Sequence, residues 1–185
     1  MYASSSSVYG PEAEVPFRLS ANTDRPANMY AASKTTDELL ARHYCAVRGL
    51  QPVGLRFFTV YGEWGRPDMS VYKFGEAILT RRDIPMFFVR YILPKYKNQS
   101  QTSLLYVHLV LITCFSEESP LSRDFTHVDD VSNGILSAVE YKPRTCKEVF
   151  NLGFGNPVSV PEMIKILEQE MAIPAKVVSV NPLSR

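Results

Sequence analysis

The chain has 185 residues, of which 45% are hydrophobic and 21% are charged, which suits one globular domain or a domain with a small appendage. Twenty basic and nineteen acidic residues leave a net charge of +1, so the overall charge gives no reason to expect a nucleic-acid partner. The three cysteines, Cys45, Cys114 and Cys146, are widely spaced and form no C-x-x-C pair. We therefore expect neither a disulfide framework nor a metal site.

The sequence shows no secretory signal, because Met1-Tyr2-Ala3 leads directly into four serines. Its most apolar run, 104–115, has twelve residues, whereas a helix needs ~20 to cross a bilayer. The chain as given therefore reads as soluble.

Short apolar runs alternate with helical patterns, which is typical of an α/β protein with a parallel sheet. In chain order, the patterns predict the end of a strand at 1–5, a loop at 11–26, a helix at 28–48, a strand at 52–58, a loop at 61–69 and a helix at 71–82. Further along they predict a helix at 129–141, a strand at 149–152, a helix at 160–171 and a short strand at 176–180.

The stretch 89–122 fits neither pattern. Its 34 residues change from a polar, Tyr- and Lys-rich beginning to an apolar block, and this length is unusual for a loop in a compact domain. We interpret it as an insertion. Two origins are open: a loop particular to this lineage, or a translated intron, since Val89-Arg90 is compatible with the codons of a splice donor.

Tyr30 and Lys34 lie four residues apart in the first expected helix, and therefore on one face of it. A lysine ammonium beside a phenol stabilises the phenolate, so the tyrosine can act as a general acid or base. The spacing alone is weak evidence, because a second such pair occurs at Tyr91 and Lys95.

Four consecutive serines, 4–7, stand at the end of the first expected strand, 25 residues before Tyr30 when counted from Ser5. Ligands bind at the carboxyl ends of strands in parallel sheets. Hydroxyl groups there can hydrogen-bond a substrate oxygen beside the tyrosine. The alternative interpretation of four serines is a solvated linker.

Four ordered motifs together resemble a known family. They are Ala-Ser-Ser-Ser-Ser-Val-Tyr-Gly at 3–10, Tyr30-x-x-x-Lys34, Leu-Arg-Phe-Phe-Thr-Val-Tyr-Gly at 55–62, and Arg-Asp-Phe-Thr-His-Val-Asp-Asp at 123–130. The chain resembles the extended short-chain dehydrogenases/reductases, in particular the NAD-dependent epimerase/dehydratase family and, within it, the UDP-glucuronate 4-epimerases. The resemblance covers 1–87 and 123–171.

This resemblance implies an α/β fold: the carboxyl-terminal half of a Rossmann-type, doubly wound parallel sheet, with a small α/β substrate-binding region. Residues 1–62 would form the last part of the NAD-binding domain, with the catalytic serine and the Y-x-x-x-K motif. Residues 63–185 would mix the substrate-binding region with returning sheet elements, interrupted by the insertion at 89–122.

The resemblance also implies roles for individual side chains. Ser5, Tyr30 and Lys34 would be catalytic. Tyr30 would accept the proton of the sugar O4 while NAD takes a hydride from C4, and Lys34 would contact the nicotinamide ribose and tune Tyr30. The implied substrate contacts are Ser4, Ser5, Ser6 and Thr59, whose hydroxyls suit a C5 carboxylate, and Arg66, whose guanidinium suits a UDP phosphate.

The implied activity is epimerisation at C4 of a UDP-sugar through a 4-keto intermediate, with UDP-glucuronate to UDP-galacturonate as the first candidate. Related dehydratases and decarboxylases carry carboxylic acids in the turn where this chain has Ser6 and Ser7, which disfavours dehydration. UDP-glucose 4-epimerase, or another extended reductase, is the alternative within the enzyme class. The family also leads us to expect a homodimer formed through the helix that carries Tyr30.

The sequence departs from the family at the dinucleotide fingerprint. Gly153-Phe154-Gly155 is followed by Val158 where a third glycine would stand. We therefore expect that the family's pyrophosphate-binding half precedes Met1 and is missing, and that a membrane anchor of the parent, if there is one, is missing with it. The alternative interpretation from outside the enzyme class is an inactive fragment that cannot hold NAD.

Overall fold

The computed structural model describes residues 1–88, 114–115 and 121–180. The chain divides into two compact units. The first unit comprises Met1–Trp64 and Asp124–Asn156, and the second comprises Gly65–Arg123 and Pro157–Arg185. Each unit is described by itself below.

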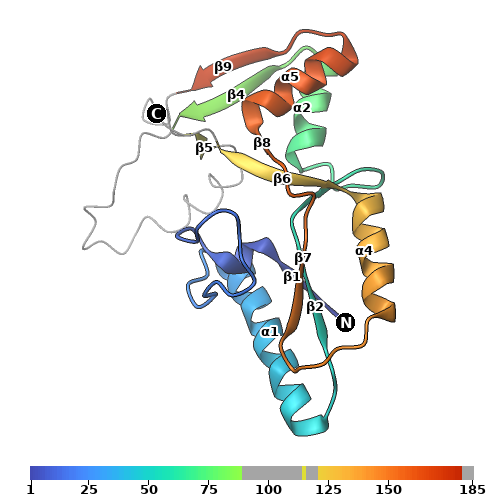
Figure 1. Cartoon of the computed structure of the whole chain (residues 1–185). Coiled ribbons are helices and arrows are strands. Elements are labelled where there is room, and N and C mark those ends of the chain that lie inside the picture. The colour runs from blue at the N-terminus through green and yellow to red at the C-terminus, as the bar shows by residue number, and fades with distance from the viewer. Residues whose placement is uncertain (89–113, 116–120, 181–185) are drawn as a thin grey trace, which may run out of the picture. The chain divides into compact units, whose positions relative to one another are not determined.

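A three-stranded parallel sheet forms the centre of the first unit. Its strands are β1 (Tyr2–Ser5), β2 (Val53–Phe57) and β7 (Glu148–Leu152), in the order β1-β2-β7. Helix α1 (Met29–Arg48) and helix α4 (Val128–Glu140) lie on opposite sides of this sheet (Figure 1). The α/β architecture with a parallel sheet that the sequence predicts is therefore confirmed.

Strand β2 lies between the other two strands and faces a helix on each side, so it is apolar along nearly its whole length. Val53 and Leu55 form the hydrophobic core of this unit with Ala138 of α4. Arg56 points to the opposite face, where it meets α1. This alternation follows from the two-residue period of a strand, which sends neighbouring side chains to opposite faces.

Helix α1 begins and ends at residues that suit helix termini. The Asn28 side chain accepts a hydrogen bond from the backbone N–H of Ala31, 2.8 Å away, and so caps the first turn. Gly49 terminates the helix with a φ of 66°, in the left-handed region where glycine carries no steric penalty. The predicted helix at 28–48 therefore agrees with the structure to within one residue.

Two further strands of the first unit are absent from the sequence-based prediction. Strand β3 (Thr59–Tyr61) pairs in parallel with the end of β6 (Ser122–His127), and α4 follows β6 without a loop. A short 3-10 helix, η1 (Ser6–Tyr9), follows β1. The Asp124 carboxylate in β6 accepts the backbone N–H groups of Phe154 and Gly155 at 2.9 and 2.8 Å, and so fixes the turn after β7.

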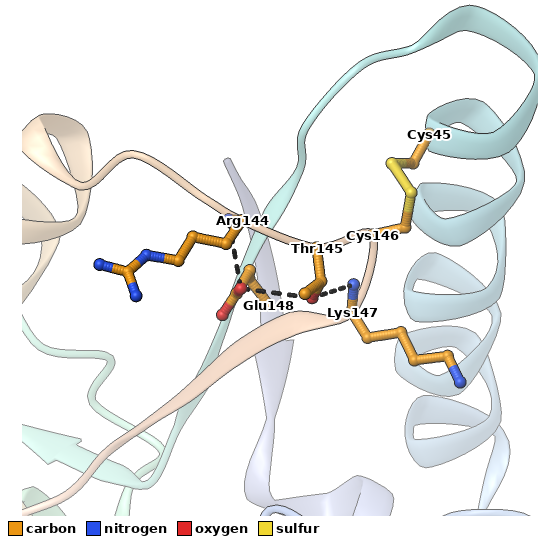
Figure 2. The surroundings of a disulfide bond; sticks show 6 residues. All are labelled: Cys45, Arg144, Thr145, Cys146, Lys147 and Glu148. Atoms are coloured by element: carbon orange, nitrogen blue, oxygen red, sulfur yellow. Dashed lines mark hydrogen bonds between the residues drawn. A yellow bond between two sulfur atoms is a disulfide. The ribbon is translucent and has the colours of Figure 1, made fainter.

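The spacing of the cysteines predicts no disulfide framework, but the structure contains a disulfide. Cys45 in the last turn of α1 is bonded to Cys146 in the turn before β7, and Figure 2 shows this link between helix and turn. The carboxylate of Glu148 organises that turn by accepting hydrogen bonds from the Arg144 backbone N–H and the Thr145 hydroxyl. The two cysteines are 101 residues apart, and only the fold brings them together.

The second unit has its own parallel sheet, in which β4 (Asp83–Phe88) lies between β5 (Cys114–Phe115) and β9 (Lys176–Val180). Helix α2 (Ser70–Leu79) packs against helix α5 (Val160–Met171), which follows the short strand β8 (Pro157–Ser159). The expected insertion at 89–122 lies outside the described residues except at 114–115 and 121–122. In the described part of the chain, no helix has both the length and the apolar character needed to span a membrane.

Candidate active site

Ser5 stands at the carboxyl end of β1, where the strand passes into η1. Its side chain is buried, and its hydroxyl oxygen caps η1 by accepting the backbone N–H of Ser7 at 3.2 Å. The same hydroxyl donates to the Ser7 hydroxyl, also at 3.2 Å. Ser6, the next residue, is half-buried in η1. The serine run is thus an ordered strand end and helix start, and the interpretation as a solvated linker is wrong.

Tyr30 and Lys34 lie in the first and second turns of α1. The Tyr30 side chain is 54% exposed, so its phenol is open to a ligand. The Lys34 ammonium donates to the backbone oxygen of Ala3 at 3.1 Å and to the Asp37 carboxylate at 3.1 Å. Lys34 therefore attaches the helix that carries Tyr30 to β1 two residues before Ser5.

The Ser4 side chain is buried against α1. It is 1% exposed, and its hydroxyl donates to the Glu38 carboxylate at 2.7 Å. Its hydroxyl is therefore engaged inside the protein, between β1 and α1. This placement argues against Ser4 as a substrate contact, and we leave it out of the proposed site.

The acid that binds Ser4, Glu38, is a buried residue that the sequence motifs do not predict. Glu38 is fully buried, and its two oxygens accept hydrogen bonds from Nε and Nη2 of Arg56, each at 2.8 Å. Burial alone would raise the pKa of Glu38, but the hydrogen bonds from Arg56 and Ser4, together with the charges of Arg56 and Arg42, hold that pKa below its ordinary value. Glu38 is therefore ionised at neutral pH. The sequence could have indicated this residue, because Glu38 stands four residues after Lys34.

The other two predicted substrate contacts lie in different units. Thr59 begins β3 in the first unit, half-buried and paired with Phe125 of β6. Arg66 belongs to the second unit, where its exposed guanidinium is hydrogen-bonded to Asp68 through two N–H groups and lowers the pKa of that carboxyl. The structure thus brings Ser5, Ser6, Tyr30, Lys34 and Thr59 into one unit and leaves Arg66 outside it.

A hollow of about 290 Å³ opens where β3 and β6 end, lined by Glu63, Trp64, His127, Val128 and Asp129. The Trp64 side chain is 99% exposed. His127 caps α4, because its Nδ1 accepts the backbone N–H of Asp129 at 3.3 Å. The residues that the structure describes contain no group of His, Cys, Asp and Glu side chains that could hold a metal ion.

The structure places Ser5 at the end of one parallel strand and places Tyr30 and Lys34 on the helix joined to that strand, which is the arrangement that the resemblance to the short-chain dehydrogenases/reductases implies. The chain belongs to the NAD dependent epimerase/dehydratase family, whose model matches residues 1–153.

Relatives and solved structures agree with this family. The chain is 37% identical over 176 residues to an uncharacterized protein of Methanocaldococcus jannaschii, covering 95% of this chain and 44% of that protein. It is 36% identical over 187 residues to UDP-glucuronate 4-epimerase 4 of Arabidopsis thaliana, covering 95% of this chain and 37% of that protein. The crystal structure of UDP-glucuronic acid 4-epimerase from Bacillus cereus with UDP-glucuronic acid and NAD matches with a TM-score of 0.73 and 25% identity, covering 97% of this chain and 47% of that chain. The chain thus spans less than half the length of these relatives.

Proposed function

We propose that this chain carries the catalytic residues of an NAD-dependent UDP-sugar 4-epimerase that interconverts UDP-glucuronate and UDP-galacturonate. The observation that carries the proposal is the attachment of Lys34 to the Ala3 backbone, which ties the open Tyr30 phenol to the strand that ends in Ser5. The names of the relatives support the choice of substrate, since several of them are UDP-glucuronate 4-epimerases.

The proposed chemistry divides among three side chains. Tyr30 takes the proton of the sugar 4-hydroxyl, and the Ser5 hydroxyl donates a hydrogen bond to the same oxygen. Lys34 holds the helix that carries Tyr30 against β1, and the proton returns from Tyr30 to O4 once the 4-keto sugar has turned its other face. NAD, when bound, supplies the hydride acceptor and donor for C4.

Among the residues that the structure describes, two suit the nicotinamide end of NAD. Tyr30 and Lys34 suit the nicotinamide ribose, by the resemblance stated above. The turn at Gly153-Phe154-Gly155 does not suit the pyrophosphate, because its N–H groups at 154 and 155 already bind the Asp124 carboxylate. A phosphate would meet that carboxylate instead of free N–H donors. The pyrophosphate would therefore be bound by residues other than these.

The neutral serine and threonine hydroxyls of this chain support the choice of a sugar with a carboxylate as the substrate. We propose that Ser6 and Thr59, both in the first unit, bind the C5 carboxylate. Ser6 and Ser7 offer no carboxylic acid that could help expel water, which disfavours dehydration of the sugar. The alternative substrate is UDP-glucose, which lacks the carboxylate.

The test is an assay of the chain joined to the amino-terminal segment of UDP-glucuronate 4-epimerase 4 of Arabidopsis thaliana that precedes the matched region. We expect conversion of UDP-glucuronate, with a kcat/KM at least tenfold above that for UDP-glucose. Equal or higher efficiency with UDP-glucose would overturn the choice of substrate, and inactivity towards both would overturn the proposed function.

The inactive-fragment interpretation has its own test. The occupied N–H groups at 154 and 155 favour it for the 185-residue chain by itself. We expect isothermal titration of this chain with NAD to show no micromolar binding. Micromolar binding would show that the chain contains a pyrophosphate site and would refute this second proposal.

A further inference from the structure

Two side chains of α1, one turn apart, hold two consecutive residues of β1. Lys34 donates to the backbone oxygen of Ala3, and the Glu38 carboxylate accepts the hydroxyl of Ser4. The next residue along the strand is Ser5. The distance between the helix that carries Tyr30 and the strand end that carries Ser5 is therefore set at two points, and the second depends on a buried charge.

Glu38 also holds β2. The Nε and Nη2 groups of Arg56 donate to its two oxygens, and the Arg56 guanidinium lies over the ring of Tyr9, 4.6 Å from the ring centroid. Tyr9 ends η1, the helix that Ser5 caps, and its hydroxyl donates to Asn151 of β7 at 2.7 Å. The network thus reaches Ser5 from both sides, through Ser4 before it and Tyr9 after it.

We propose that Glu38 is a positioning residue for the proposed epimerisation: acting through Ser4 and Arg56, it holds the Ser5 hydroxyl in reach of the oxygen that Tyr30 deprotonates. Glu38 touches neither substrate nor cofactor, and its charge is balanced by Arg56, so its effect is geometric. Small misplacements of reacting groups are costly in enzymes, about 100-fold for 1 Å. This inference rests on the proposed function, and the experiment below separates the two.

The decisive variant removes the buried pair and keeps the packing: Glu38→Leu combined with Arg56→Met. Replacing a buried ion pair by apolar side chains of similar volume often leaves stability unchanged or raised. In the fusion used for the activity assay, we expect this double variant to keep the melting temperature and to lose kcat by about tenfold or more, with KM changed less than about twofold. Glu76→Gln, at an exposed glutamate of the second unit paired with Arg82, is the matched control and should change neither.

A milder variant covers the case in which the double variant does not fold. Ser4→Ala deletes the hydroxyl that joins β1 to Glu38 and leaves the pair with Arg56 in place. We expect a several-fold lower kcat at unchanged KM. A folded double variant with wild-type kcat would overturn the proposal, as would wild-type kcat in Ser4→Ala if the double variant is unfolded.

Hydrogen exchange in the 185-residue chain supplies a readout that needs no activity. We expect the backbone amides of residues 3–9 to exchange about tenfold faster in the double variant, or in Ser4→Ala, while those of β7 keep their rates. If the fusion is inactive towards both sugars, the proposed function fails, and hydrogen exchange alone then tests the positioning role of Glu38. Unchanged exchange at 3–9 would then overturn the positioning role.

Discussion

The ammonium of Lys34 lies 3.1 Å from the backbone oxygen of Ala3, two residues before Ser5. This contact makes α1 and β1 one rigid support for the proposed acid/base, Tyr30. The same ammonium is 3.1 Å from Asp37, so it is held from the strand and from its own helix. Tyr30 is exposed beside this support, which a residue needs if it is to contact a ligand.

The first prediction concerns Tyr30. Tyr30→Phe removes the hydroxyl that we propose exchanges a proton with the sugar, and general acid–base catalysis contributes about 100- to 10,000-fold. We expect kcat of the fusion to fall by at least about 100-fold, measured as UDP-galacturonate formed from UDP-glucuronate. Tyr44→Phe, at an exposed tyrosine of the same helix, is the control and should retain activity. A Tyr30→Phe enzyme within tenfold of the wild type would contradict the role.

Acid should destabilise the protein partly through Glu38. Against the effect of burial, hydrogen bonds from Arg56 and Ser4 hold its pKa below the ordinary value of 4.5, so its stabilising contribution is complete above that pH and is lost as the pH falls through the lowered pKa. Glu38→Gln leaves Arg56 buried without its partner and should cost about 3–5 kcal/mol of unfolding free energy at pH 7. This cost should shrink as the pH drops below 4.5.

Denaturant unfolding at a series of pH values measures this effect. The curve of Glu76→Gln should run parallel to that of the wild type, because Glu76 is exposed and its loss leaves no buried charge. A pH-independent difference between wild type and Glu38→Gln would show that the Glu38 carboxylate does not titrate as described.

The disulfide should stabilise the first unit. A bond between residues 101 apart restricts the unfolded chain strongly, and such bonds contribute about 2–4 kcal/mol. We expect Cys45→Ala combined with Cys146→Ala to lose that amount in denaturant unfolding without a reductant. Dithiothreitol should lower the stability of the wild type to that of the double variant and leave the variant unchanged. Equal sensitivity of both proteins to the reductant would contradict the bond.

Asp124 should be needed for the turn after β7. Its carboxylate accepts two backbone N–H groups. Asp124→Ala removes this acceptor from the Gly155 N–H and leaves the Phe154 N–H only the Thr126 hydroxyl, at 3.1 Å. We expect a loss of about 1–3 kcal/mol in unfolding free energy. Asp24→Ala, in the exposed loop before α1, is the control and should change stability by less than about 0.5 kcal/mol.

The exposed apolar face of α1 should mediate self-association, as the family resemblance suggests. Leu40, Tyr44 and Val47 follow the spacing of one helix face, and each is at least half exposed. We expect sedimentation to give about twice the monomer mass of 20.9 kDa, and Leu40→Glu to give the monomer. Leu136→Glu, at an exposed leucine of α4, should leave the dimer intact. A monomeric wild type would contradict the prediction.

Regular periodicity made α1, β2, α4, α5 and β9 predictable within one to three residues. The sequence did not reveal β3, β4 and β6, because β3 has only three residues and the residues of β4 and β6 show no clear two-residue period. Position along the chain also could not show which serine of the run is engaged inside the protein. Ser4 and Ser5 are the same residue type one position apart, and only the fold shows that the Ser4 hydroxyl is bound by Glu38.

The Cys45–Cys146 bond and the Glu38–Arg56 pair were missed for a related reason. Each joins segments that the chain brings together only after the sheet has formed, and neither follows a local spacing rule. The motif residues Ser5, Tyr30 and Lys34 were recognisable because their spacing repeats a pattern of a known family. The residues that hold these motif residues in place, such as Glu38 and Arg56, follow no spacing pattern that the sequence analysis recognised.

The bond between Cys45 and Cys146 turns everything from 46 to 145 into a covalently closed ring, which contains the whole of 89–122. A protease that cuts once anywhere in that ring leaves the two pieces attached. Such nicked protein would run near 20.9 kDa without a reductant and separate into fragments with one. After a single cut within 89–122, α1, which carries Tyr30, would thus remain covalently joined to the segment that contains β7.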